Sequence, residues 1–149
     1  MAGGVRYADV EVGTQLPPKV FTVTRADLVR YAGASGDFNP IHWSDRTARA
    51  VGLPGVIAHG MLTMGLAIRV VTEWVADPAA IVEYGVRFTR PVVVPDDDTG
   101  TQVTVSGVVK KTFDDGRVQI DLTATCGGEG GDGGEKVLTQ ARAIVKLPS

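Results

Sequence analysis

Cysteine and histidine are scarce in this sequence, and it has no cluster of positive charge. The single cysteine, Cys126, excludes an internal disulfide, and its place in an alternating strand pattern predicts a small packed side chain without a chemical role. A formal net charge of -2 and a sequence pI near 5.6 provide no basic stripe for phosphate backbones. We therefore expect no nucleic-acid partner.

The sequence also has no apolar run long enough to span a bilayer, and segment 1–7 has no apolar core of the kind that directs export. We therefore expect no membrane association, and a soluble protein of the cytoplasm. The chain has 149 residues, of which 44% are hydrophobic, and this is enough for a sizeable core. We expect one domain over residues 1–149.

The first half of the chain carries helix signals. Thr24, with an acidic residue three positions later, resembles a capped helix start, and Gly33 is expected to end that helix. Ser44 is expected to cap a second short helix that runs through Val51. Segment 61–75 is apolar on almost every side but short for a membrane span. It predicts a helix buried on most of its faces inside the domain.

The second half of the chain alternates apolar and polar residues, which is typical of strands in an antiparallel sheet. A turn at 114–116, with the sequence Asp-Asp-Gly, is a hairpin signal within this half. A sheet with one apolar face can cover the long helix, so the expected fold class is α+β, with a sheet wrapped around a central helix. The expected strands lie at 84–88, 103–109, 118–126 and 137–147, with a small edge strand near 21–23.

Two proline-rich or glycine-rich segments interrupt this pattern. Segment 91–98, which has prolines at both ends of a valine run, predicts an edge segment followed by a turn. The glycine-rich segment 127–134 predicts a flexible connector between strands. A phosphate-binding loop is not expected there, because the segment lacks the lysine of such loops and precedes a strand.

A carboxylate and one of the two histidines share a motif in segment 31–43. Asp37 and His42 lie on either side of Pro40, which excludes helical geometry for Asn39, so we expect a shaped loop. Apolar neighbours are expected to desolvate the carboxylate and make it a better proton acceptor, and histidine titrates near neutral pH. Such a pair favours general acid–base catalysis over a turn cap and a loop histidine. The apolar neighbours are Phe38, Ile41 and Trp43.

The second histidine lies in the motif Ala58-His59-Gly60-Met61, directly before the apolar segment. If a helix begins near Gly60, its first N–H groups have no partner within the helix, and the helix dipole adds partial positive charge there. Such an end can stabilise an oxygen that gains negative charge. A tight turn into a packed helix would require the same glycine, so the residues leave open both an oxyanion-binding role and a purely structural role for Gly60. The residues are compatible with a His59 that orients a neighbour or lines the site, but a structural histidine near the helix start is the expected role.

A metal site is not expected from the spacing of the candidate ligands. The two histidines are far apart in the sequence, and their nearest carboxylates are Asp37 and Asp45. No compact zinc or iron motif has this pattern.

The segment Ser35-Gly36-Asp37-x-Asn39-Pro40-x-His42, followed by the second histidine motif, resembles the signature of the MaoC-like hydratase/dehydratase family. These are (R)-specific enoyl-thioester hydratases, and the resemblance runs through most of the chain. It is similar in particular to the small B-type subunit of the heterodimeric (3R)-hydroxyacyl-acyl-carrier-protein dehydratases. The resemblance implies a single hot-dog fold, in which an antiparallel sheet wraps around a long helix.

The resemblance also implies a reaction, which is the reversible hydration of trans-2-enoyl thioesters to (3R)-3-hydroxyacyl thioesters in fatty-acid metabolism. Asp37 and His42 would be catalytic, with Gly60 N–H on the thioester oxygen and Asn39 and His59 as further oxyanion or substrate-binding residues. The acyl carrier would be coenzyme A or acyl carrier protein, and no cofactor or metal is implied. Assembly is expected as a homodimer or as a heterodimer with a related hot-dog subunit, because a lone sheet leaves an exposed edge.

Two other functions fit the same fold. An acyl-thioester hydrolase also activates water beside a thioester, and it would release free thiol. A non-catalytic acyl-binding subunit of a dehydratase heterodimer would need neither proton-transfer residue. The presence of both Asp37 and His42 favours hydration over each alternative.

Overall fold

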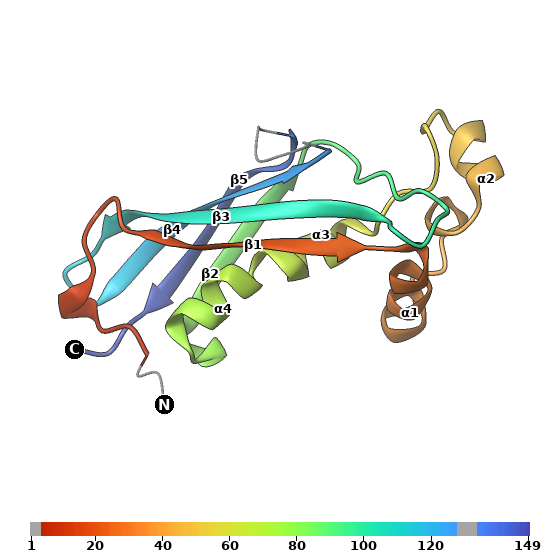
Figure 1. The fold of residues 1–149 in the computed structure, drawn as a ribbon. Helices are drawn as coiled ribbons and strands as arrows, with labels where there is room; N and C mark the ends of the chain where they lie inside the picture. The colour runs from red at the N-terminus through yellow and green to blue at the C-terminus, as the bar shows by residue number, and fades with distance from the viewer. Residues whose placement is uncertain (1–3, 128–133) are drawn as a thin grey trace.

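The computed structural model describes residues 4–127 and 134–149 (Figure 1). Most of the predicted glycine-rich connector, residues 128–133, lies outside the described residues. A sheet forms one layer, and a long helical segment lies along one of its faces. The loops and short helices that hold the candidate site gather at one end of the sheet, and the C-terminus lies at the other end. No helix of the described residues is long and apolar enough to cross a membrane.

The sheet has the strand order β1-β3-β4-β5-β2, and all neighbouring strands are antiparallel. The predicted strands are confirmed, and the edge strand near 21–23 begins earlier than expected. One difference concerns β2, which lies beside β5 at the far edge rather than beside the next strand along the chain. The bounds are β1 Gln15–Val23, β2 Ile81–Phe88, β3 Thr101–Thr112, β4 Arg117–Cys126 and β5 Glu135–Lys146.

The core lies between the helical layer and the inner face of the sheet. Alternate residues of the central strands β3 and β4 point inward and are almost fully buried, as the period of two predicts. Each fully buried valine, leucine or isoleucine contributes roughly 1.5–3 kcal/mol through removal of its side chain from water. The buried inward-facing residues of β3 and β4 are Val103, Val105, Val109, Val118, Ile120, Leu122 and Ala124.

The predicted long helix consists of two consecutive helices, α3 Gly60–Ala67 and α4 Arg69–Val75, joined at Ile68. Helix α4 packs against β1 and β3. Tyr84 of β2 donates its hydroxyl proton to the Met64 carbonyl at 2.6 Å, and burial raises the pKa of Tyr84, so this donor keeps its proton. The two edge strands thus hold the helical segment, because β2 binds α3 through Tyr84 and β1 packs against α4.

The expectation that this segment is buried on most faces is wrong for the single chain. Its fully buried residues form one stripe toward the sheet, whereas Met61 is exposed and other apolar side chains are only partly buried. The physical reason is that a five-stranded sheet covers only one side of a helix. The buried stripe consists of Thr63, Ala67, Val70, Val71 and Val75.

The first of the two predicted N-terminal helices is α1 Arg25–Ser35. Thr24 and Asp27 form a reciprocal capping box at its start, as predicted. It ends at Gly36, which has a left-handed backbone with φ 77°, and not at Gly33. A glycine inside a helix is tolerated at a modest cost, whereas the left-handed position at a helix end strongly favours glycine.

Helix α2 Asp45–Ala50 is the second predicted helix, and Ser44 caps it by accepting the Thr47 N–H. The chain then returns toward the sheet, where the Ala58 N–H donates to the Val92 carbonyl and the Val94 N–H donates to the Val56 carbonyl. The predicted edge segment at 91–98 is therefore a short pairing with the stretch just before α3. Three 3₁₀ helices complete the described elements: η1 Tyr7–Asp9, η2 Pro40–His42 and η3 Pro78–Ala80.

Candidate active site

The loop between α1 and α2 is shaped by side chains that accept nearby backbone N–H groups. Ser35, Asp37 and Asn39 each accept the N–H of the residue two positions later, at distances of 3.2, 3.1 and 3.2 Å. Short polar side chains favour such turns where the backbone cannot continue a helix. Asn39 therefore shapes the loop, and one oxygen of Asp37 is fixed within it.

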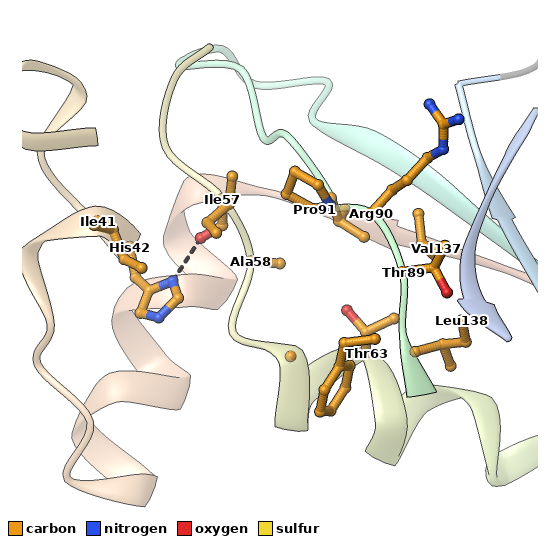
Figure 2. Close-up of a pocket in the computed structure, with 13 residues that line it drawn as sticks. Ile41, His42, Ile57, Ala58, Thr63, Thr89, Arg90, Pro91, Val137 and Leu138 are labelled. Carbon is orange, nitrogen blue, oxygen red and sulfur yellow. Dashed lines mark hydrogen bonds between the residues drawn. The ribbon is translucent and has the colours of Figure 1, made fainter. Parts of the chain in front are cut away.

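His42 belongs to η2 and is nearly buried, with 8% of its surface exposed. Its Nδ1–H donates to the Ile57 carbonyl at 2.7 Å, which leaves the lone pair on Nε2 (Figure 2). The Ile57 N–H donates in turn to the Ile41 carbonyl at 3.2 Å. The imidazole thus has a defined orientation and a defined nitrogen that can accept a proton.

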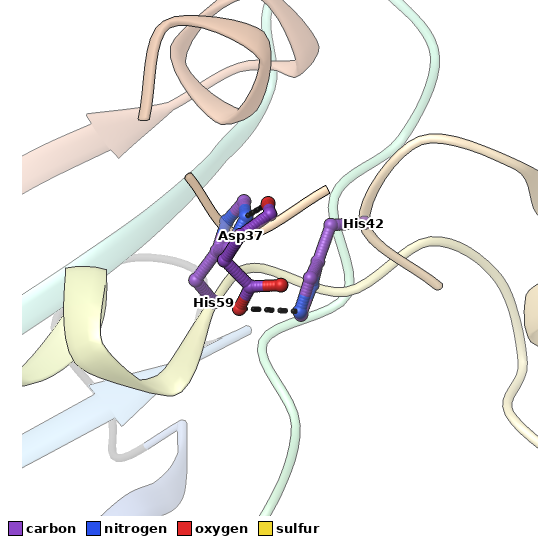
Figure 3. Close-up of side chains that lie close together, drawn as sticks. All are labelled: Asp37, His42 and His59. Atoms are coloured by element: carbon purple, nitrogen blue, oxygen red, sulfur yellow. Dashed lines mark hydrogen bonds and ion pairs between the residues drawn. The ribbon is translucent and has the colours of Figure 1, made fainter. Parts of the chain in front are cut away.

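Asp37 Oδ2 lies 3.9 Å from His42 Nε2 (Figure 3). This distance is too long for a direct hydrogen bond, but one water molecule between the two atoms can contact both. The side chain of Asp37 is 51% exposed, so solvent reaches the pair from the surface. The arrangement is suited to proton transfer to and from a shared water.

The expected apolar enclosure of Asp37 is not present in the single chain. Phe38 is 63% exposed and Trp43 is 56% exposed, so neither ring covers the carboxylate. The Trp43 Nε1–H donates to the Phe38 carbonyl at 2.9 Å. This local hydrogen bond holds the indole against the outside of the loop, and the predicted desolvation by these two rings is therefore wrong here.

Gly60 is the first residue of α3, as the sequence pattern suggested. The first N–H groups bonded within this helix are those of Leu62 and Thr63, which donate to the His59 carbonyl. The N–H of Gly60 precedes them and is one of the end groups that a helix leaves for other acceptors. A Cβ on Gly60 would lie 3.1 Å from the Phe88 ring, so this close approach favours glycine.

A cavity of about 360 Å³ lies beside His42 and Gly60 (Figure 2). Its wall comes from the η2 loop, the start of α3, the end of β2 with the following residues, and β5. Apolar side chains dominate the lining, which suits an apolar chain with a polar reacting end. The lining residues are Ile41, His42, Ile57, Ala58, Gly60, Thr63, Phe88, Thr89, Arg90, Pro91, Val92, Val137 and Leu138.

His59 precedes α3 and is 1% exposed. Its Nε2–H donates to the Asp37 carbonyl at 3.1 Å, and its ring stacks on His42 with 3.8 Å between the centroids. The structure thus brings Asp37, His42, His59 and Gly60 together from two segments of the chain. Of the predicted site residues, His42 and Gly60 line the described cavity, whereas Asp37, Asn39 and His59 do not.

Asp37, His42 and His59 each offer a possible ligand atom, and these atoms lie within 4.8 Å of one another. The two imidazole planes are inclined by only 22° and are stacked, so their lone pairs point along nearly parallel planes. A metal ion must lie in the plane of each ring that binds it, at about 2.0–2.1 Å from the nitrogen. Two stacked rings cannot meet this condition at one ion, so the three residues do not fit a shared metal.

Sequence reasoning missed the contacts that hold these groups in place. The Ile57 carbonyl orients His42, and Phe88 lies against Gly60, but neither residue has a local sequence signal for that role. The same is true of Asp45, which was considered only as one of the carboxylates nearest to the histidines. It accepts two hydrogen bonds from Arg25, at 2.9 and 3.0 Å, and the Val56 N–H at 3.0 Å.

These bonds form a clip, defined here as Arg25, Asp45 and the backbone groups of Val56 and Val94. Arg25 Nε donates to the Val94 carbonyl at 2.7 Å, so the clip joins both N-terminal helices to the stretch before α3. The Val56 N–H and the Arg25 guanidinium hold the pKa of Asp45 below its usual value. The loop that carries Asp37 and His42 is therefore tied at both ends to the body of the protein.

The chain matches the family model described as "MaoC like domain" over residues 9–126. It is 33% identical to the (R)-specific enoyl-CoA hydratase of Rhodospirillum rubrum over 145 residues, which cover 96% of this chain and 92% of that protein. It is 41% identical to 3-hydroxyacyl-thioester dehydratase X of Mycobacterium tuberculosis over 83 residues, which cover 54% of this chain but only 29% of the relative.

A solved structure of a MaoC-like dehydratase aligns with a TM-score of 0.89 and 37% identity, and covers 97% of this chain and 43% of its own. The HadBC (3R)-hydroxyacyl-ACP dehydratase complex of Mycobacterium tuberculosis aligns with a TM-score of 0.64 and 19% identity, over 91% of this chain and 96% of that chain. At this identity the second likeness shows the fold alone. The expected hot-dog fold is confirmed, and the chain belongs to the MaoC-like dehydratase family.

Proposed function

We propose that this chain catalyses the reversible syn addition of water to trans-2-enoyl thioesters, which yields (3R)-3-hydroxyacyl thioesters in fatty-acid metabolism. One observation carries the proposal: Asp37 and His42 face each other across a gap suited to one water, and His42 lines an apolar cavity together with Gly60. The names of the relatives, an (R)-specific enoyl-CoA hydratase among them, support the same reaction.

In the proposed mechanism, the acyl chain lies in the cavity and the thioester oxygen accepts the Gly60 N–H. This oxygen becomes enolate-like as water attacks, and an N–H placed at the positive end of a helix stabilises it most at that moment. Asp37 and His42 hold the water, remove one of its protons and return a proton to the α-carbon from the same side. They act as a coupled pair, and in dehydration the same steps run in reverse.

The proposal also covers the carrier and the assembly. The acyl group is carried by coenzyme A or by acyl carrier protein, and no cofactor takes part, because the thioester itself acidifies the α-carbon. Among the residues that the structure describes, β2 has a strand neighbour on one side only, and Val82 and Phe88 on it are exposed. An edge of this kind favours pairing with a second copy or with a related hot-dog subunit.

The test is an assay of the purified protein, alone and with candidate partner subunits, against enoyl thioesters of graded length. Hydration is followed by the loss of enoyl-thioester absorbance, and the product is analysed on a chiral phase. We expect the (3R)-3-hydroxyacyl thioester without release of thiol. Release of free thiol from saturated acyl thioesters would identify a hydrolase instead, and no turnover with any partner would favour a non-catalytic subunit.

A further inference from the structure

His59 is the most fully buried titratable group beside the candidate site, and the proposed reaction gives it no chemical step. Three different contacts fix its ring. Its Nε2–H donates to the Asp37 carbonyl at 3.1 Å, and one face stacks on His42 (Figure 3). Tyr31 packs against it in an edge-to-face arrangement with 4.7 Å between the centroids. The residue after it is Gly60, the first residue of α3.

These contacts join the two halves of the site. The hydrogen bond holds the backbone of Asp37, and the stack supports the face of His42, whose edge is held by the Ile57 carbonyl. Because His59 directly precedes Gly60, the contacts of its ring also tie the start of α3 to the Asp37–His42 pair. The ring therefore helps to set the distance between the proton-transfer groups and the oxyanion donor.

We propose that His59 is a positioning residue of the hydration reaction, which acts as a neutral imidazole that carries its proton on Nε2. This inference rests on the proposed function. The N–H aligns Asp37 by its main chain, and the flat ring prevents His42 from turning out of line. Catalysis depends steeply on such alignment, because small displacements of reacting groups cause large losses in rate.

The burial of His59 does not suit a direct part in proton transfer. Its Nδ1 is buried and has no hydrogen-bond partner among residues 4–127 and 134–149, so none of these residues can relay a proton to it. Burial also lowers the pKa of His59, which keeps the ring neutral at neutral pH. A buried nitrogen without a partner costs stability. That cost is understandable if the site needs a ring and an N–H donor in one side chain.

Three variants separate the ring from the donor. His59→Phe keeps a flat ring and removes the N–H, His59→Gln keeps an amide N–H at a similar reach and removes the ring, and His59→Ala removes both. We expect kcat to fall by about a hundredfold in His59→Ala, with little change in KM. His59→Phe and His59→Gln should each retain several-fold more turnover than His59→Ala. Thermal unfolding of each variant shows whether it is folded at the assay temperature.

The pH profile of kcat separates a positioning role from proton transfer, and the fall in kcat without a change in KM separates positioning from support of the fold alone. We expect every variant to keep both limbs of the wild-type profile, since His59 does not titrate in the reaction. Loss of one limb in His59→Gln would overturn the proposal, because it would make His59 a proton-transfer group. Wild-type kcat in folded His59→Ala would also overturn it.

Imidazole NMR provides a second test that does not depend on turnover. The chain has only two histidines, so one substitution assigns both ring signals. We expect His59 to remain neutral, with its proton on Nε2, to a lower pH than a free histidine, and titration at the ordinary pKa would overturn the proposal. If the wild-type protein hydrates no enoyl thioester, the proposed function fails. If it does so and His59→Ala matches it, only this inference fails.

Discussion

The loop that carries Asp37 and His42 differs from the central strands β3 and β4 in how its backbone is held. The strands pair along almost their whole length, and their inner residues are packed against one another. The loop has little regular pairing and relies on side chains that accept N–H groups and on two imidazole rings held by carbonyls. We therefore expect the strands to provide most of the stability, whereas the loop holds the proposed proton-transfer residues, and substitutions in the two regions should separate these properties.

The largest expected effect is on turnover in the loop. Asp37→Asn and His42→Ala should each lower kcat by about a hundredfold to ten-thousandfold, because each removes a proposed proton-transfer group. Enoyl-thioester hydration by purified variants measures this. Asp9→Asn, an exposed aspartate in η1 at the far end of the sheet, is the matched control and should behave as wild type. Normal turnover in either folded loop variant would remove the pair from the mechanism.

In the strands, the expected effect is on stability. Ile120→Ala on β4 leaves a cavity in the core and should lower the free energy of unfolding by about 2–5 kcal/mol, as such truncations do. Denaturant unfolding gives this value, and kcat per folded molecule should stay near wild type. Thr123→Ala, an exposed position of the same strand, should change stability far less. A large loss of kcat in folded Ile120→Ala would show that the two regions are coupled.

Gly60 allows a test of the oxyanion donor, because proline is tolerated at the first position of a helix. His59 has φ -58° and ψ 131°, a conformation that a following proline accepts. Gly60→Pro removes the N–H and should lower kcat by about a hundredfold to a thousandfold. Gly60→Ala keeps the N–H but adds the Cβ that meets Phe88, and so measures crowding alone. Equal activities of the two variants would show that the N–H is not needed.

The clip at Asp45 should make stability depend on pH. The pKa of Asp45 is lowered in the folded protein, so its contribution is present above the unfolded value of 3.8 and is lost as the pH falls through the folded pKa. Asp45→Asn should therefore be less stable than wild type at neutral pH. The difference in the free energy of unfolding between Asp45→Asn and wild type should be smaller at about pH 3, as measured by denaturant unfolding. A difference that grows on acidification would contradict the assigned ion pair.

The smallest expected effect is at the cap of α2. Ser44→Ala leaves the Thr47 N–H without its acceptor and should lower the free energy of unfolding by about 1 kcal/mol. Ser44→Gly should cost less, because glycine is a better cap than alanine. Thermal or denaturant unfolding measures both. A large fall in kcat of the folded variant, with only this small loss of stability, would show that the cap also positions the catalytic loop.

Features that depend on neighbours in the sequence were predicted well. The caps at Thr24 and Ser44 and the alternating buried residues of β3 and β4 follow from local geometry, and the structure contains them. The end of α1 was placed at the wrong glycine, because two glycines three positions apart are both compatible with the local pattern. The closeness of Asp37 and His42 was predictable since a short loop joins them.

The sequence by itself determined which chemistry is available, because the carboxylate, the imidazoles and the glycine at the helix start all lie in two short motifs. Only the tertiary structure decided how these motifs meet. The stack of His59 on His42, the carbonyl of Ile57 on His42, and the approach of Phe88 to Gly60 join residues distant in the chain. A backbone carbonyl or a packing contact has no residue signature of its own, so such contacts become definite only when the sheet and the helix have packed together.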